Sequence, residues 1–137
     1  MRTATVRWVG GEEYLATMPS GQAVVIDADR EHNSAPGPMD MLLGALGACS
    51  SVDVVAILAK KRQKLVSLEV VISGERAKEP PSVWTKIEMV YKLTGEVDEK
   101  AARDAIELSQ TKYCSVAAML RKTAEISYRF EIAPAKG

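Results

Sequence analysis

Residues Pro36–Lys61 read PGPMDMLLGALGACSSVDVVAILAKK, a long stretch with only two charged residues before its final lysines. Proline is tolerated in the first turn of a helix, and Asp40 places a carboxylate there, where the helix dipole favours negative charge. Lys60 and Lys61 end the stretch with the opposite charge. The residues between are apolar on nearly every side, which predicts one long helix buried on most faces.

This helix has the length of a membrane span, but its composition favours a buried core helix. Asp40 and Asp53 lie inside the stretch, and charged sequence flanks both ends. Small residues gather close to one face and allow another backbone to come near; they are Gly44, Gly47, Ala48 and Ser51. In so short a chain we expect that neighbour to be the same helix of a second copy, and therefore a homodimer without membrane insertion.

The 137 residues predict a single domain, residues 1–137. The formal net charge is zero, which argues against nucleic acid as a partner. No apolar leader follows Met1-Arg2, so we expect a cytoplasmic protein. Two cysteines in such a chain indicate free thiols or redox chemistry rather than a structural disulfide framework.

Alternating and periodic segments flank the long helix on both sides. Strands are predicted at residues 3–9, 14–18, 23–26, 68–76, 83–93 and 125–132, and further helices at 98–112 and 115–122. The strands come in hairpins rather than as a βαβ series, and Gly10-Gly11 forms the first turn. Gly95 is expected to end the fifth strand, and Asp98 to cap the helix that follows. The resulting order, βββ-α-ββ-αα-β, predicts an α+β fold with mostly antiparallel sheets around the long helix.

Cys49 and Cys114 are the candidate reactive residues. A buried cysteine is ordinarily a small, inert hydrophobic residue, and that interpretation stays open for each of them. Both are followed by serine and lie at or near helical backbone. Cys114 falls at a break between two helices, where free N–H groups can lower a thiol pKa.

A metal site is not expected, because two cysteines and His32 without CxxC or HxxxH spacing supply too few ligands. No other cofactor is expected either. His32 lies in a polar loop, where we expect it to be solvated.

Two aspartates are supporting candidates. Asp53 follows Cys49 by one helical turn, on the same face. Ionised, it would raise the thiol pKa or hold a cation; equally, it could be a buried carboxylate that accepts hydrogen bonds. Asp40 is better explained as a favourable charge in the first turn of the helix.

Three motifs together resemble the OsmC/Ohr family of osmotically induced and organic hydroperoxide resistance proteins. Pro38-Met39-Asp40-Met41-Leu42 opens the helix, Gly47-Ala48-Cys49 lies within it, and Cys114-Ser-Val-Ala-Ala follows a later helix. The resemblance covers essentially the whole chain. The opening motif and Cys49-Ser-Ser-Val-Asp53-Val are most similar to a subgroup of small members.

The resemblance implies an intertwined homodimer with the two long helices packed between the sheets and a site at each subunit interface. It also implies a thiol peroxidase of the oxidative and osmotic stress response. Cys49 would attack an organic hydroperoxide, admitted through an apolar pocket, and Cys114 would resolve the product to a disulfide. A dithiol of the lipoyl type would then reduce that disulfide.

The sequence departs from the family pattern in two places. The family has an activating arginine in the loop after the first strand, where this chain has Glu12 and Glu13. The family's partner glutamate follows the helix-opening proline, where this chain has Met39, with Asp40 one residue later. We therefore expect a disfavoured thiolate and slow peroxide reduction. The alternative is a non-catalytic dimer that binds a small apolar or thiol ligand at the interface.

Overall fold

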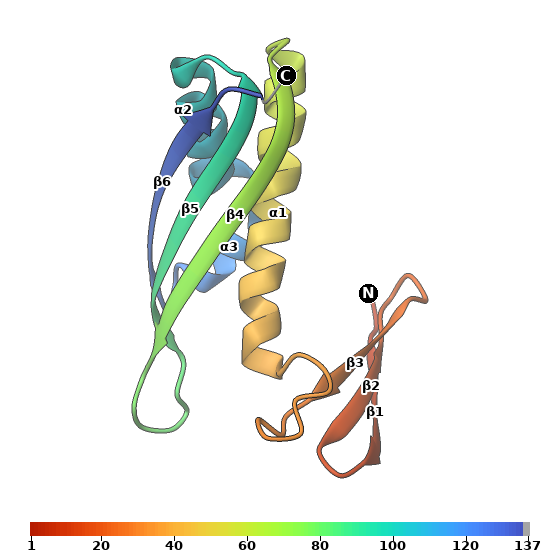
Figure 1. Ribbon diagram of the computed structural model, residues 1–137. Coiled ribbons are helices and arrows are strands. Elements are labelled where there is room, and N and C mark those ends of the chain that lie inside the picture. Colours follow the sequence, from red (N-terminus) through yellow and green to blue (C-terminus); the bar gives the residue numbers. More distant parts are fainter. Residues whose placement is uncertain (136–137) are drawn as a thin grey trace. The chain divides into compact units, whose positions relative to one another are not determined.

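The computed structural model describes residues 1–135, which form two compact units. The boundary between the units along the sequence lies between residues 42 and 43. The elements follow the order βββ-α-ββ, two α-helices joined by a π-helical turn, and a final β-strand (Figure 1). The α+β class and the predicted order are confirmed. Each unit is described below by itself.

The first unit is a three-stranded antiparallel sheet in the order β1-β2-β3. Its strands are β1 (Thr5–Gly10), β2 (Glu13–Thr17) and β3 (Ala23–Asp27). Gly10 and Gly11 adopt positive φ and close the first hairpin, as the Gly-Gly sequence predicts. Among the strand residues only Ala16 and Asp27 are buried, so this sheet has almost no core of its own.

The long helix is α1 (Pro38–Lys60), with 23 residues. By length and composition it could cross a membrane, as core helices of soluble proteins also could. The chain itself covers only part of this helix, so the expected burial of its other faces by a second copy stays a prediction. One stripe is buried, at the three- and four-residue spacing of a helix face; it consists of Leu46, Gly47, Ser50, Val54 and Leu58.

Gly47 serves a different neighbour from the one predicted. A Cβ at this position would collide with the Ile72 side chain of the second sheet, so Gly47 allows close packing within its own chain. A Cβ at Gly44 would meet open space, and Ala48 is exposed. The predicted face of small residues is therefore split between the core and the surface.

The second sheet has the order β4-β5-β6 and comprises β4 (Lys64–Arg76), β5 (Trp84–Glu96) and β6 (Glu125–Ala133). β4 and β5 pair antiparallel, as predicted, whereas β5 and β6 pair parallel because helices connect them. Gly95 does not end β5 as expected. It has a φ of +135°, and a Cβ there would collide with the Lys64 backbone, so glycine lets the two strands stay paired.

The connection from β5 to β6 runs through α2 (Glu99–Leu108), the π-helix η1 (Ser109–Tyr113) and α3 (Ser115–Leu120). Asp98 caps α2 by accepting a hydrogen bond from the Ala101 N–H at 3.2 Å, as predicted. Alternate residues of β5 pack with the buried stripe of α1 and with α2 to form the core. Its largest fully buried apolar members are Leu46, Leu58, Ile87, Met89, Tyr91, Leu93 and Ile106.

Candidate functional site

The two cysteines meet in the second unit. Cys49 lies in α1 and is half-buried, whereas Cys114 lies between η1 and α3 with only 2% of its surface exposed. Both are free thiols, and the thiol of Cys114 hydrogen-bonds Cys49. The Cys49 Sγ also lies 3.8 Å from the Ser115 Oγ. The fold thus joins two residues whose distance along the chain gave no indication of contact.

The surroundings of Cys49 favour its thiolate. Burial raises the pKa of Cys49, but four hydrogen bonds together outweigh it and leave the pKa below its usual value. In order of effect, they come from the Val116 N–H, the Cys114 thiol, and the hydroxyl and N–H of Ser115. The expected high pKa is therefore wrong. Cys49 lies mid-helix in α1, but it faces the first residues of another helix, α3.

The surroundings of Cys114 favour its neutral thiol. Burial raises the pKa of Cys114 to about 11, even though the Ala117 N–H donates to its Sγ at 3.4 Å. The neighbouring Cys49 and the charge of Asp53 raise the pKa of Cys114 further. At neutral pH Cys114 therefore keeps its proton and donates it toward Cys49. Neutral donors thus supply the stabilisation that the family pattern assigns to an arginine.

Asp53 joins this site as a hydrogen-bond acceptor. Its Oδ2 accepts from the Ser109 Oγ at 2.9 Å. Of the interpretations left open by the sequence, the structure supports the carboxylate that accepts hydrogen bonds. Its charge acts on Cys114, a neighbour that spacing along the helix did not reveal.

A buried polar network lies beside the cysteines, and the sequence did not predict it. The Ser50 Oγ is 2.5 Å from the Tyr91 OH and 2.8 Å from the Ser109 Oγ. The Gln110 Nε2 donates to the Tyr91 OH at 2.6 Å and to the Met89 Sδ at 3.2 Å. Polar residues at helix positions that face inward could have indicated this network. An analysis of the hydrophobic pattern alone does not detect them.

Asp40, the other supporting candidate, forms an ion pair with a residue of the first unit, Arg30. Its Oδ2 accepts from the Arg30 Nη1 at 2.7 Å, and both side chains are more than half exposed. Arg30 also donates to the Asp27 backbone oxygen at 3.2 Å. Asp40 thus holds the loop before α1 to the first turn of the helix, and Arg30 was absent from the sequence-based candidates.

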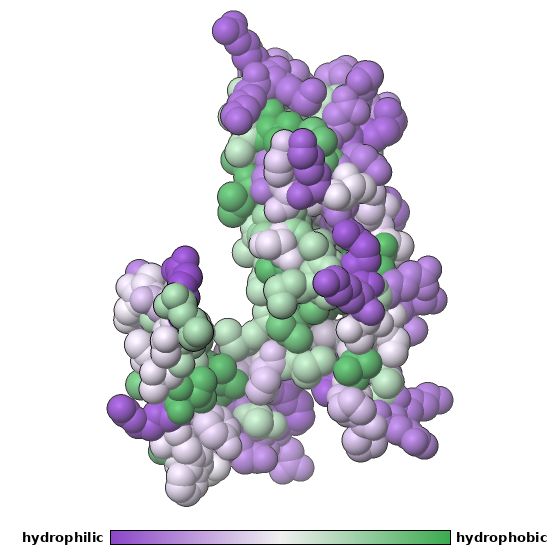
Figure 2. Space-filling model, turned by 180° about the vertical axis from the view of Figure 1, so that it is seen from behind, coloured by the Kyte–Doolittle hydropathy of each residue, from purple (hydrophilic) through white to green (hydrophobic). Residues whose placement is uncertain are grey.

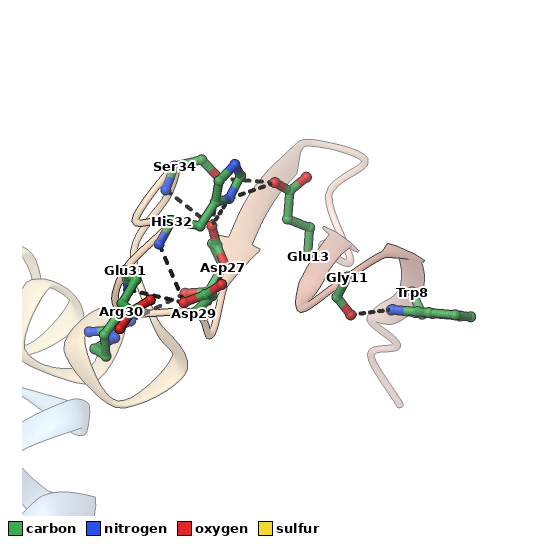
Figure 3. Close-up of polar contacts among 9 residues, drawn as sticks. All are labelled: Trp8, Gly11, Glu13, Asp27, Asp29, Arg30, Glu31, His32 and Ser34. Carbon is green, nitrogen blue, oxygen red and sulfur yellow. Dashed lines mark hydrogen bonds and ion pairs between the residues drawn. The ribbon is translucent and has the colours of Figure 1, made fainter.

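His32 is not merely solvated, as the sequence suggested. Its Nδ1 lies 2.8 Å from the Asp27 Oδ2 and 3.2 Å from the Glu13 Oε1 (Figure 3). The hydrogen bond with Asp27 raises the pKa of His32. The Ser34 hydroxyl, at 2.7 Å, and the N–H groups of Asp29 and Ser34 hold the pKa of Asp27 well below its usual range.

Among the described residues, the donor atoms of Glu13, Asp27 and His32 form the group that most resembles a metal-ligand set, since they lie within 4.8 Å of one another. The contacts within this cluster already engage these atoms. We therefore describe it as an ionic cluster that fixes the loop after β3.

The sequence profile of the family described as "OsmC-like protein" matches residues 31–129, a range that contains both cysteines. The chain belongs to the OsmC-like family. It is 41% identical to Protein YhfA of Escherichia coli strain K12 over 133 residues, which cover 96% of this chain and 98% of that protein. The expected likeness to a subgroup of small family members is confirmed.

Solved structures of the family share the fold. The OsmC-like protein of Mycoplasma pneumoniae superposes with a TM-score of 0.85 at 16% identity, over 97% of each chain. The organic hydroperoxide resistance protein OhrB of Bacillus subtilis superposes with a TM-score of 0.66 at 13% identity, over 96% of this chain and 98% of that one. The OsmC fold is therefore established for this chain.

Proposed function

We propose that this protein is a two-cysteine thiol redox protein that reduces hydroperoxides, with Cys49 attacking and Cys114 resolving. The observation that carries the proposal is the hydrogen-bonded thiol pair, in which the pKa of Cys49 is lowered and that of Cys114 is raised to about 11. A reactive thiol needs its thiolate form, and a resolving thiol beside it should keep its proton until it is needed.

In the first step the Cys49 thiolate attacks the peroxide. A sulfur–oxygen bond forms and the O–O bond breaks, so the sulfur is oxidised to a sulfenic acid and the peroxide leaves as an alkoxide that takes up a proton. The Cys114 sulfur then attacks the Cys49 sulfur. A disulfide forms, and the hydroxyl of the sulfenic acid leaves with the Cys114 proton as water.

A dithiol closes the cycle by two exchange steps, which return both cysteines to thiols and leave the reductant as a disulfide. We propose a lipoyl-type dithiol for this role and an organic hydroperoxide as oxidant, as the OsmC/Ohr resemblance implies. Free thiols and a cycle of this kind fit the reducing cytoplasm, where we place the protein.

We also propose that the protein works as a homodimer built on α1. Opposite its buried stripe, α1 exposes a row of small apolar residues at helical spacing; it comprises Ala45, Ala48, Val52, Val55, Ala56 and Ala59. Figure 2 shows hydrophobic surface along this helix, and Val52 is 68% exposed. A contiguous apolar surface of this kind typically marks an interface.

The test is peroxide consumption with dihydrolipoamide as reductant, with OhrB of Bacillus subtilis assayed beside it. We expect turnover by the wild type, no turnover by Cys49→Ser, and a sulfenic acid trapped by dimedone in Cys114→Ser. We expect a lower rate than that of OhrB, because neutral donors and not an arginine stabilise the Cys49 thiolate.

Peptide mapping of the oxidised wild type should find a Cys49–Cys114 disulfide within one chain. Cysteines that stay reduced at a peroxide excess that oxidises OhrB would overturn the redox function. That result would favour the alternative of a dimer that only binds a small apolar or thiol ligand.

A further inference from the structure

The hydroxyl groups beside the cysteines can be assigned a single donor direction, which Asp53 sets. An ionised carboxylate only accepts hydrogen bonds, so the single proton of the Ser109 hydroxyl points to Asp53 at 2.9 Å. The Ser50 carbonyl is a second acceptor for that proton, but it is uncharged and lies farther away, at 3.4 Å.

The remaining protons follow from this first one. Because the Ser109 hydroxyl uses its single proton in the hydrogen bond to Asp53, Ser50 must donate to Ser109, across 2.8 Å. Tyr91 must in turn donate to Ser50, and the Tyr91 oxygen is left to accept from the Gln110 amide N–H. The chain therefore runs from Gln110 through Tyr91, Ser50 and Ser109 to Asp53, and each bond polarises the next.

The end of the hydrogen-bond chain at Gln110 explains why one buried polar atom there has no partner. Gln110 is 1% exposed, and its Oε1 is the one buried side-chain N or O atom that lacks a hydrogen-bond partner in the described part of the chain. Turning the amide over would place Oε1 against the Tyr91 oxygen, whose proton already points to Ser50. The orientation of Gln110 thus follows from the charge on Asp53.

This chain of hydrogen bonds is attached to both cysteines. Asp53 follows Cys49 by one turn of α1, and Ser109 begins the π-turn that ends before Cys114. The Cys114 N–H donates to the Ser109 backbone oxygen at 2.8 Å. The residue that Asp53 holds by its side chain therefore holds Cys114 by its backbone.

We propose that Asp53 is a positioning residue for the cysteine pair: it anchors the π-turn through Ser109, and its charge adds to the burial that keeps Cys114 protonated beside Cys49. The consequence for catalysis rests on the proposed function, but the effect on the thiols does not. The titratable groups that face Cys114 are Cys49 and Asp53 from α1 and Tyr91 from β5.

The experiment measures the iodoacetamide alkylation rate of each cysteine against pH by peptide mass spectrometry, without peroxide. In Asp53→Asn, which keeps the size of the side chain but removes its charge, we expect about threefold more Cys114 thiolate at a given pH, because burial, the largest cause of the raised pKa, remains. Asp53→Glu keeps the charge and should leave the Cys114 profile closer to that of the wild type than Asp53→Asn does. Asp104→Asn, at an exposed ion pair with Lys100 on α2, is the matched control and should leave the profile unchanged.

Ser109→Ala tests the same proposal without removing the charge. The released carboxylate should turn to solvent, and the Cys114 profile should move in the same direction by a smaller amount. A Cys114 profile that stays at the wild-type position in both variants would overturn the proposal, and Ser109→Ala decides alone if Asp53→Asn does not fold. Because the readout requires no peroxide, a protein without peroxidase activity could still pass this test.

Discussion

The two sheets of this protein differ in what covers them. In the second sheet, alternate residues of β5 are buried against α1 and α2, and Ile87 and Tyr91 are fully inaccessible. In the first sheet every residue of β1 is exposed, and the Trp8 side chain is 65% exposed. Three strands without a packed face are not stable in isolation. The second sheet is therefore stabilised by its own chain, whereas the first requires a further surface.

The largest expected effect lies in the second sheet. Ile87→Ala removes a fully buried side chain and leaves a cavity, which should lower the free energy of unfolding by about 2–5 kcal/mol. Urea denaturation followed by circular dichroism measures it. Val6→Ala, at a residue of β1 that is 61% exposed, is the control in the first sheet and should stay within about 0.5 kcal/mol of wild type. Equal losses in the two variants would contradict the contrast between the sheets.

A smaller effect is expected on the exposed stripe of α1, if a second copy supplies the missing surface. Val52→Asp places a charge at the centre of the proposed contact and should weaken association at least tenfold, or about 1.4 kcal/mol. Light scattering after size exclusion measures the mass, and amide exchange in β1–β3 should rise as dimers dissociate. Val52→Ala should have a weaker effect. A wild type that is monomeric at micromolar concentration would refute the dimer.

The smallest effect concerns pH and the first sheet. Because the folded pKa of His32 is raised, its contribution to stability is full below about 6.5 and is lost as pH rises through the folded value. Asp27 acts oppositely: its pKa is lowered, so its contribution is present above its ordinary pKa and is lost as pH falls below it. Protection of the β1–β3 amides from exchange, taken relative to their intrinsic exchange rates at each pH, should therefore be greatest in weakly acidic solution. His32→Gln should remove the change near neutral pH, and an identical profile in that variant would contradict the assignment.

Much of the fold could be predicted because its signals are local. The near absence of charge between Asp40 and Lys60 predicted α1, Gly10-Gly11 predicted the first hairpin, and Asp98 predicted the start of α2. The parallel pairing of β5 with β6 and the partner of Gly47 could not be predicted in this way, since both depend on contacts between distant segments.

The candidate site shows the same limit. Both cysteines and Asp53 could be selected by residue type, but the pKa of Cys49 depends on Ser115 and Val116, which only the fold brings beside it. An argument from helix position and the acidic loop therefore gave the wrong direction for that pKa. Ser109 and Tyr91 carry no motif, and their role follows from three-dimensional contacts alone.

The π-helical turn η1 has a consequence for how this chain can change in length. A π-turn corresponds to one residue inserted into an α-helix, and each helical residue turns the chain by about 100° and advances it by about 1.5 Å. Loss of one residue between Leu108 and Cys114 would restore regular winding and rotate Cys114 away from Cys49, while α2 and β6 could remain paired with their neighbours. Evolution can therefore separate or unite these two thiols by a single-codon insertion or deletion, without altering either cysteine.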